Sequence, residues 1–260
     1  MSAEAAPADP QLHSALERLA SHATLLVALD FDGCVAELVP DADAARPVPA
    51  NAAALGRLAD ASGVTLAYVS GRPLETLRRL ASPPEGTLLI GSHGAERCLG
   101  PDSAGLVLSA QEQIARTAVI DALEQVASTA DGAWVEHKPA GAAIHVRRVE
   151  DPDLAQKVLE EARAVLAEVD GAHAKEGKAV VESVVVLSTK GEALTDLRSH
   201  VRPGAVLFAG DDVTDEHGFA VLEGDDVGVK VGPGSTAAGH RIDTPADLAG
   251  VLDTLTQLRS

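Results

Sequence analysis

The chain has 260 residues, 46% of them hydrophobic and 23% charged, so it is long and apolar enough to bury a sizeable core. Its formal net charge of −18 argues against nucleic acid or an anionic membrane surface as a partner, because both are negatively charged themselves. Its two cysteines, Cys34 and Cys98, form no disulfide framework, and the N-terminus lacks the basic start of a signal peptide. We therefore expect a cytoplasmic protein without a membrane span. The sequence does not give the oligomeric state, and a monomer is the expectation.

Strands and helices alternate in the first part of the chain. A helix is predicted after Asp9-Pro10, which suits an N-cap followed by proline at the first helical position. Short continuous apolar runs predict buried strands at 24–29, 64–69 and 87–90, with helices at 51–61 and 73–80. This alternation is typical of βαβ units and predicts a parallel sheet.

The pattern changes after Ser109 and returns after Thr189. The intervening elements are helix, strand, strand, helix, strand, strand, at 111–128, 133–138, 143–148, 151–169, 172–175 and 179–185. This order predicts an open-faced α+β layer, which we take as an inserted domain over 110–187. The flanking parts, 1–109 and 188–260, then form one α/β core. The remaining core elements are strands at 205–209 and 227–231 and helices at 190–200, 214–222 and 245–258.

The strongest local signal is LDFDG at 29–33, directly after a predicted buried strand. In open α/β sheets, ligands bind beyond the carboxyl ends of the strands. The carboxylates of Asp30 and Asp32 repel each other there, which favours a bound cation, and carboxylate oxygens with water suit Mg²⁺. Turn chemistry explains the pair equally well, because Asp and Gly are common at strand ends.

A second acidic motif, GDDVTDE at 210–216, follows the predicted strand 205–209. Helix capping and the helix dipole explain Asp215 and Glu216. They do not explain Asp211 and Asp212 at the end of the strand. Metal binding is therefore the better interpretation when this motif is combined with the first.

Two further junctions carry groups that suit an anion. In SGR, at 70–72, Ser70 offers a hydroxyl and the backbone offers free N–H groups at a helix start, although a glycine-containing βα turn is the commoner reason for such a motif. Lys190 opens a helix, where the dipole disfavours a cation, so an anion nearby would explain it.

The order of these motifs, D-x-D, Ser, Lys and DD, resembles that of the haloacid dehalogenase superfamily of phosphotransferases. The resemblance implies a Rossmann-like parallel sheet core of the haloacid dehalogenase type with an inserted α+β cap domain. It implies that Asp30 is the nucleophile that becomes an aspartyl-phosphate. Asp32 would be the general acid for the leaving oxygen and later the general base for water. The phosphoryl oxygens and the substrate site would involve Ser70, Lys190, Gly71 and Arg72.

The same resemblance implies Mg²⁺ as the cofactor. Its ligands would be the Asp30 carboxylate, the Asp32 backbone carbonyl and Asp211, with help from Asp212 or Asp215. The residue after Gly33 is Cys34, where this superfamily usually has Thr, and a modest effect is expected because Cys packs similarly but hydrogen-bonds weakly.

The insert lies between the SGR motif and the Lys-Gly motif, at the position of a C2-type cap in this superfamily. Glu136 and Lys138 share one face of the predicted strand 133–138, because side chains alternate along a strand. Arg147 lies in the predicted strand 143–148, and Glu182 interrupts an apolar run. Such groups could bind sugar hydroxyls, but the alternation alone somewhat favours ordinary cross-strand ion pairs on a solvated face.

More detailed matches resemble the trehalose-6-phosphate phosphatase family, from about residue 24 to residue 231. They are LDFDG, YVSGR, GSHGAE (91–96), VEHKPAGAAIHVR (135–147), GKAVVE (177–182), KGEAL (190–194) and GDDVTDE. The family resemblance implies that Glu136, Lys138 and Glu182 contact the sugar distal from the phosphate, and that His93 and Arg147 line the same pocket. It implies a Mg²⁺-dependent phosphatase that releases trehalose and phosphate.

Other interpretations stay open from the sequence alone. A similar cap could serve another sugar phosphate, such as sucrose phosphate or mannosyl-phosphoglycerate, and Ser183-Val184 stands where the family often has Arg-Pro. A signalling receiver domain also combines acids, a hydroxyl and a lysine, but the D-x-D pair and the large insert argue against it. A catalytically inactive binding module is disfavoured because every catalytic position is filled.

Overall fold

The computed structural model describes residues 9–100, 103, 105–106, 108–177 and 179–260. Contacts within the chain divide it into two compact units. The core unit comprises Met1–Ala104 and Ser188–Ser260, and the insert unit comprises Gly105–Leu187. Whether the insert unit acts as a cap domain with the predicted boundaries stays a prediction.

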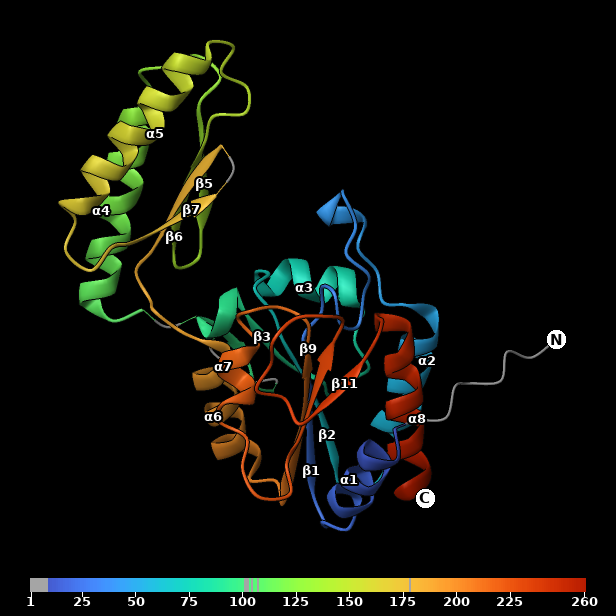
Figure 1. Cartoon of the computed structure of the whole chain (residues 1–260). Coiled ribbons are helices and arrows are strands. Elements are labelled where there is room, and N and C mark those ends of the chain that lie inside the picture. Colours follow the sequence, from blue (N-terminus) through green and yellow to red (C-terminus); the bar gives the residue numbers. More distant parts are fainter. Residues whose placement is uncertain (1–8, 101–102, 104, 107, 178) are drawn as a thin grey trace. The chain divides into compact units, whose positions relative to one another are not determined.

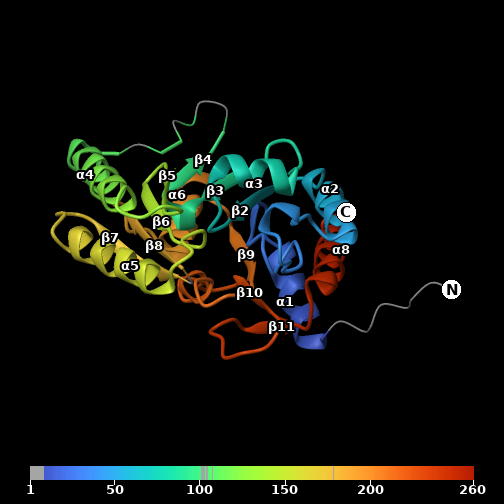
Figure 2. The same ribbon diagram turned by 90° about the horizontal axis from the view of Figure 1, so that it is seen from above.

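The core unit is built on a seven-stranded sheet in the order β11-β10-β9-β1-β2-β3-β4 (Figure 2). Neighbouring strands are parallel, except that β4 runs antiparallel to β3. The strands are β1 (Leu25–Leu29), β2 (Val64–Val69), β3 (Leu88–Gly91), β4 (Glu96–Cys98), β9 (Ala205–Gly210), β10 (Val227–Val231) and β11 (His240–Ile242). The mainly parallel sheet confirms the α/β fold class.

Helices cover both faces of the core sheet (Figure 1). The odd-numbered residues of β1 pack towards α1 (Pro10–Ala20), α2 (Pro49–Ala59), α3 (Leu74–Ala81) and α8 (Leu248–Leu258). The even-numbered residues pack towards α6 (Lys190–Val201) and α7 (Glu216–Phe219). All five residues of β1 are buried for this reason, which is why the strand is apolar without alternation. Short 3-10 turns are η1 (Ala42–Ala44), η2 (Ser92–Gly94) and η3 (Pro245–Asp247).

The observed elements of the core differ from the predicted ones in two short strands without an apolar run and in the bounds of two helices. Strands β4 and β11 have three residues each and no apolar run, so the sequence pattern gives no sign of them. The helix predicted at 214–222 shrinks to the four residues of α7, because a tight turn occupies the residues before Glu216. Helix α2 begins two residues before its predicted start, at Pro49, since proline is favoured at the first helical position.

The insert unit is a four-stranded antiparallel sheet, in the order β5-β6-β8-β7, with two helices packed on one face (Figure 1). Its elements are α4 (Ala110–Ala127), β5 (Trp134–Lys138), β6 (Gly141–His145), α5 (Pro152–Ala167), β7 (His173–Gly177) and β8 (Val180–Val184). The apolar residues of α4 and α5 pack against Val181 and the even-numbered residues of β6. This arrangement confirms the predicted α+β character of the insert.

The hairpin between β5 and β6 corrects one predicted strand. Lys138 pairs with Gly141, so the turn has two residues and β6 covers 141–145 rather than 143–148. Arg147 therefore lies in the turn after β6, exposed, and not on the strand. Gly141 fits here because a Cβ at this position would lie 1.9 Å from the carbonyl oxygen of Ser183 on the neighbouring β8.

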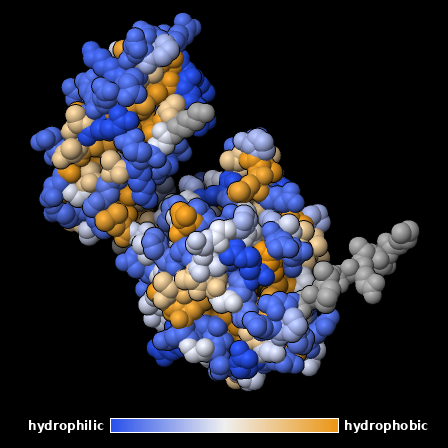
Figure 3. Space-filling view, viewed as in Figure 1, coloured by the Kyte–Doolittle hydropathy of each residue, from blue (hydrophilic) through white to orange (hydrophobic). Residues whose placement is uncertain are grey.

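The surface is mostly hydrophilic on the face drawn in Figure 3, in line with the net charge of −18. Exposed large apolar side chains are scattered over both units and include Leu38, Ile114 and Val213. Among the described residues, no helix combines the length and the apolar character that a membrane crossing requires.

Candidate active site

The sequence motifs meet at one edge of the core sheet. Strands β9, β1 and β2 are neighbours and parallel, so their carboxyl ends lie together. Asp30 follows β1, Ser70 follows β2 and Asp211 follows β9. Lys190, the first residue of α6, reaches the same place with its side chain. Residues far apart in the sequence therefore form one site, as the rule for open α/β sheets predicts.

Lys190 lies between two buried carboxylates. Its Nζ is 2.8 Å from Asp30 Oδ2 and 2.7 Å from Asp215 Oδ1, and its side chain is 2% exposed. Burial lowers the pKa of Lys190, but the two carboxylates outweigh this effect and hold that pKa above its usual value. Burial raises the pKa of Asp30 to about 8, even though the Lys190 ammonium lowers it. The ammonium therefore stays charged and offsets only part of the cost of burying the Asp30 carboxylate.

Three carboxylates at this edge could hold a metal ion. Asp30, Asp211 and Asp215 each offer an oxygen, and these oxygens lie within 4.8 Å of one another. The Asp211 Oδ1 atom is buried, and no hydrogen-bond partner reaches it in the part of the chain that the structure describes. Burial, followed by the charge of Asp215, raises the pKa of Asp211 to about 6. A buried, unpartnered carboxylate oxygen beside other carboxylates fits a hard divalent cation such as Mg²⁺.

Gly33 provides the space for the Asp211 carboxylate. Its φ is +76°, and a Cβ at Gly33 would lie 2.1 Å from Asp211 Oδ2. A side chain at this position would be strained in the backbone and would displace the carboxylate. Gly33 is therefore needed both for the backbone conformation of the turn and for the position of the Asp211 carboxylate.

Asp212 and Asp215, the two predicted alternatives for a further metal ligand, differ in burial and in hydrogen bonding. Asp215 is fully buried, and its Oδ2 accepts hydrogen bonds from the backbone N–H groups of Asp211 and Asp212, at 3.0 and 2.9 Å. Its other oxygen contacts Lys190, so Asp215 orients both the loop and the lysine. Asp212 is exposed, and its carboxylate accepts from the backbone N–H of Val213. Only Asp215 of the two belongs to the acidic triad.

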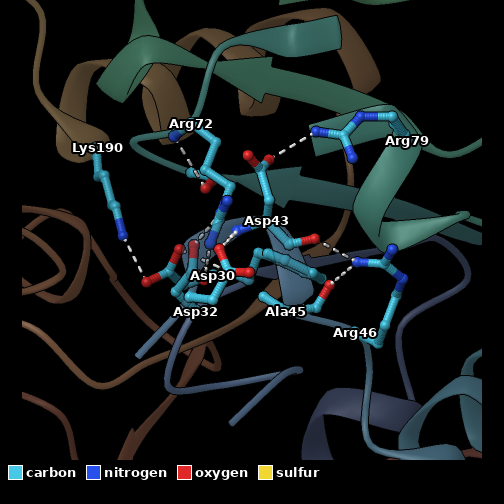
Figure 4. A network of polar contacts seen from close by, with 11 residues as sticks. Asp30, Asp32, Asp43, Ala45, Arg46, Arg72, Arg79 and Lys190 are labelled. Carbon is cyan, nitrogen blue, oxygen red and sulfur yellow. Dashed lines mark hydrogen bonds and ion pairs between the residues drawn. The ribbon is translucent and has the colours of Figure 1, made fainter. Parts of the chain in front are cut away.

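Asp32 forms a two-pronged ion pair with Arg72 (Figure 4). Arg72 Nε donates to Asp32 Oδ2 at 2.5 Å, and a second guanidinium nitrogen donates to Oδ1 at 2.6 Å. The hydrogen bonds that Arg72 donates to Asp32 raise the pKa of the Arg72 guanidinium, which also lies over the ring of Phe31. Such bidentate contacts are stronger and more directional than a single charged hydrogen bond.

Ser70 and Gly71 shape the neighbouring strand end. Ser70 is 1% exposed, and its hydroxyl accepts a hydrogen bond from the backbone N–H of Arg72 at 3.2 Å. The backbone N–H of His93 donates to the carbonyl oxygen of Ser70 at 3.0 Å. A Cβ on Gly71 would lie 2.5 Å from the His93 ring, so the ring packs directly on the glycine backbone. The structure therefore brings His93 to this edge, beside the SGR motif.

Cys34 is buried beneath the site. Burial raises the pKa of its thiol well above the usual value, and the carboxylates of Asp30, Asp215 and Asp211 add to this effect. Burial and the neighbouring charges therefore disfavour a thiolate at Cys34, and the side chain packs in the core.

The predicted sugar contacts of the insert unit gather on one face of its sheet. Lys138 Nζ lies 2.7 Å from Glu182 Oε2, and Glu136 Oε2 lies 3.0 Å from the ring nitrogen of His145. The His145 ring in turn stacks on Trp134, with ring centroids 4.1 Å apart. Ser183, the first of the two residues that stand where the family often has Arg-Pro, faces away from these groups. Its side chain is fully buried inside the insert unit.

The comparisons with known proteins agree with this arrangement. The family model described as Trehalose-phosphatase matches residues 28–245.

The chain belongs to the trehalose-phosphatase family.

Individual relatives extend this result. An uncharacterized glycosyl hydrolase of Mycobacterium tuberculosis is 33% identical over 265 residues, which cover 94% of this chain and 19% of that protein. The trehalose-6-phosphate phosphatase of Escherichia coli is 34% identical over 233 residues, which cover 87% of this chain and 85% of that protein. The chain thus spans about one fifth of the first relative and most of the second.

Solved structures show the same fold. The trehalose-6-phosphate phosphatase of Aspergillus fumigatus matches with a TM-score of 0.67 and 24% identity, over 94% of this chain and 97% of that one. A sugar phosphatase of haloacid dehalogenase subclass IIB matches with a TM-score of 0.54 and 15% identity, over 90% of this chain and 98% of that one. These likenesses confirm a Rossmann-like core of the haloacid dehalogenase type in this member of the trehalose-phosphatase family.

Sequence reasoning missed two contacts in this family member. The pairing of Asp32 with Arg72 joins residues 40 positions apart, and only the shared sheet edge hints at it. Lys230 is 4% exposed and donates a hydrogen bond to the carbonyl oxygen of Asp211. A lysine inside the apolar run VGVKV is the one sign of this contact in the sequence.

Gly33→Ala is expected to weaken binding of a divalent cation about 10-fold or more, since the new methyl group displaces the Asp211 carboxylate. Gly86→Ala is the matched control, because Gly86 has a φ of +81° but nothing within 4 Å of its would-be Cβ. Both variants should lose about 1–2 kcal/mol of stability from backbone strain. Calorimetric titration with Mg²⁺ and thermal unfolding separate the two effects, and equal cation affinity in both variants would contradict this role of Gly33.

Proposed function

We propose that this protein is a Mg²⁺-dependent phosphatase that hydrolyses trehalose 6-phosphate to trehalose and phosphate through an aspartyl-phosphate on Asp30. The observation that carries the chemistry is the buried Asp30 carboxylate, 2.8 Å from Lys190 and grouped with Asp211 and Asp215. The assignment of trehalose 6-phosphate as the substrate rests on membership of the trehalose-phosphatase family.

In the first step, an Asp30 oxygen forms a bond to phosphorus while the bond from phosphorus to the sugar oxygen breaks. Asp32 donates a proton to that leaving oxygen. In the second step, Asp32 removes a proton from a water molecule, whose oxygen attacks phosphorus and releases Asp30 and inorganic phosphate. The two carboxyls therefore return to their starting states after each turnover.

Charge is the main obstacle to the first step. A phosphate monoester and a carboxylate about 4 Å apart repel by roughly 4 kcal/mol for each pair of unit charges at an effective dielectric constant of 20. Lys190 offsets part of this repulsion from its fixed place beside Asp30, and the Ser70 hydroxyl and the backbone at Gly71 bind phosphoryl oxygens. Bound Mg²⁺, held by Asp30, the Asp32 carbonyl and Asp211, would neutralise charge on the phosphoryl group.

Arg72 links the substrate to the acid–base residue. In the free protein its guanidinium is occupied by Asp32. A phosphate offers the same two-pronged geometry as a carboxylate, so arriving substrate competes with Asp32 for Arg72. Substrate binding then releases the Asp32 carboxylate, which takes up a proton from water before it donates that proton to the leaving oxygen.

The insert unit supplies the sugar contacts in this proposal. Glu136, Lys138 and Glu182 bind hydroxyls of the distal glucose, and the insert serves as the cap. His93 of the core unit and Arg147 of the insert are further proposed contacts to the substrate. In the free protein, Lys138 and Glu182 pair with each other. Sugar hydroxyls both donate and accept hydrogen bonds. A hydroxyl can therefore donate to Glu182 in place of Lys138, and another can accept from Lys138 in place of Glu182.

A cytoplasmic location forms part of the same proposal. Both cysteines are free thiols, as expected in a reducing compartment. The partner is a small sugar phosphate, and fractionation of cells with an antibody against the protein would test the location.

The first experiment measures phosphate release, with Mg²⁺, from trehalose 6-phosphate, sucrose 6-phosphate, glucose 6-phosphate and an aryl phosphate. We expect kcat/KM for trehalose 6-phosphate to exceed that of the others by about 100-fold or more, because hydrogen-bonding sites reject analogues that leave them unpaired. Turnover of the aryl phosphate alone would keep the Asp30 chemistry and reject the substrate. No turnover of any compound would reject the phosphatase.

Two substitutions distinguish the proposed roles of Asp30 and Asp32. Asp30→Asn should reduce turnover below about 1% of wild type, because an amide is not a nucleophile, and should also weaken Mg²⁺ binding. Asp32→Asn should reduce kcat by about 100- to 10,000-fold but leave Mg²⁺ affinity nearly unchanged, because its proposed metal ligand is the backbone carbonyl. Calorimetry with Mg²⁺ and phosphate-release assays measure both, and loss of Mg²⁺ affinity in Asp32→Asn would contradict this assignment.

Glu136→Ala should lower kcat/KM for trehalose 6-phosphate about 10- to 100-fold, the cost of a charge-assisted hydrogen bond, and leave a small aryl phosphate almost unaffected. His137→Ala is the control on the same strand, because His137 contacts Glu124 of α4 on the opposite face. Equal losses on both substrates would remove Glu136 from the sugar site.

A further inference from the structure

Lys230 is a buried cation that the proposed chemistry does not use. It lies on β10 beside Gly210, the last residue of β9, and is 4% exposed. Its neighbours Val229 and Val231 pack in the apolar core on one face of the sheet, so alternation directs Lys230 to the other. Burying an ammonium group is costly unless it makes compensating contacts, so its partner at this position matters.

That partner is the loop that carries Asp211. The Lys230 ammonium donates a hydrogen bond to the main-chain carbonyl oxygen of Asp211. On the other side, the N–H of Asp211 donates to Asp215 Oδ2 at 3.0 Å. Both polar groups of the Asp211 backbone are thus held by buried side chains.

The Asp211 side chain is confined as well. Its Oδ2 lies over Gly33, and its Oδ1 is buried without a hydrogen-bond partner among the described residues. With the backbone fixed at both ends, the carboxylate has little freedom to turn towards another partner. The unpartnered oxygen is thereby kept available for a ligand.

We propose that Lys230 is a positioning residue that presents the Asp211 carboxylate to a divalent cation. This inference rests on the proposed Mg²⁺ site. Contacts of this kind behind a metal ligand typically change metal affinity 10- to 100-fold when they are removed.

The sign of the effect distinguishes positioning from simple charge. A lysine near a cation site repels the cation, so if Lys230 acted only through its charge, removing it would strengthen Mg²⁺ binding. If Lys230 holds the loop, removing it releases the Asp211 carbonyl and weakens Mg²⁺ binding despite the lost repulsion.

The test compares wild type, Lys230→Met and Lys157→Met, an exposed lysine on α5, by calorimetric titration with Mg²⁺ and by phosphate release at saturating Mg²⁺. We expect Lys230→Met to bind Mg²⁺ about 10- to 100-fold more weakly, with kcat at saturating Mg²⁺ within a few-fold of wild type. Lys157→Met should match wild type in both. Unchanged or tighter binding in Lys230→Met, or a fall in kcat that saturating Mg²⁺ does not restore, overturns the proposal.

Thermal unfolding accompanies each titration. If Lys230→Met does not fold, Lys230→Gln replaces it, because glutamine is uncharged and one bond shorter and is expected to weaken binding in the same direction. Failure of wild type and Lys157→Met to bind Mg²⁺ would reject the proposed metal site and this role with it. Normal binding by those two together with unchanged affinity in the Lys230 variant would reject this inference alone.

Discussion

The contact of Lys190 with Asp30 and Asp215 is the interaction on which the site depends. An ammonium and two carboxylates lie together at the sheet edge with almost no exposure to water. Separately, each of these groups would lose several kcal/mol on burial, and only their mutual contacts make the arrangement tolerable. Because Asp215 also holds the N–H groups of Asp211 and Asp212, the same contact fixes the loop after β9.

Full ionisation of this network would leave its charges unbalanced. The triad of Asp30, Asp211 and Asp215 has three carboxyls against the two buried lysines Lys190 and Lys230, so three ionised carboxyls would leave an excess of negative charge. Asp32 does not alter the sum, since Arg72 neutralises it. Burial raises the pKa of Asp30 and of Asp211, so a bound divalent cation would restore their charged forms. In the proposed function, a cation and an anionic substrate together complete the charge of the site.

Much of this arrangement could be predicted from the sequence, because it follows from local rules. The strands β1, β2 and β9 are largely apolar runs, and parallel order then brings Asp30, Ser70 and Asp211 to one edge. The contacts that could not be predicted depend on which strands become neighbours and how far a side chain reaches. The pairing of Arg72 with Asp32 and that of Lys230 with the Asp211 carbonyl are of this kind. The bounds of β6 could not be predicted for a similar reason, because the position of Gly141 depends on the close approach of Ser183 on another strand.

The polar contacts of the two units differ in strength in a way that suits different tasks. In the core unit, Asp30, Lys190 and Asp215 are almost fully buried, so their contacts are strong and rearrange little. In the insert unit, Lys138 and Glu182 are 25% and 30% exposed, and an ion pair at such a place contributes little to stability. Exchanging it for hydroxyl groups therefore costs little, and the polar face of the insert can change its partners without disturbing its fold. In the proposed function, chemistry in the buried network and recognition on the exchangeable surface can vary independently, so changes on the polar face of the insert can alter the substrate without disturbing the buried site.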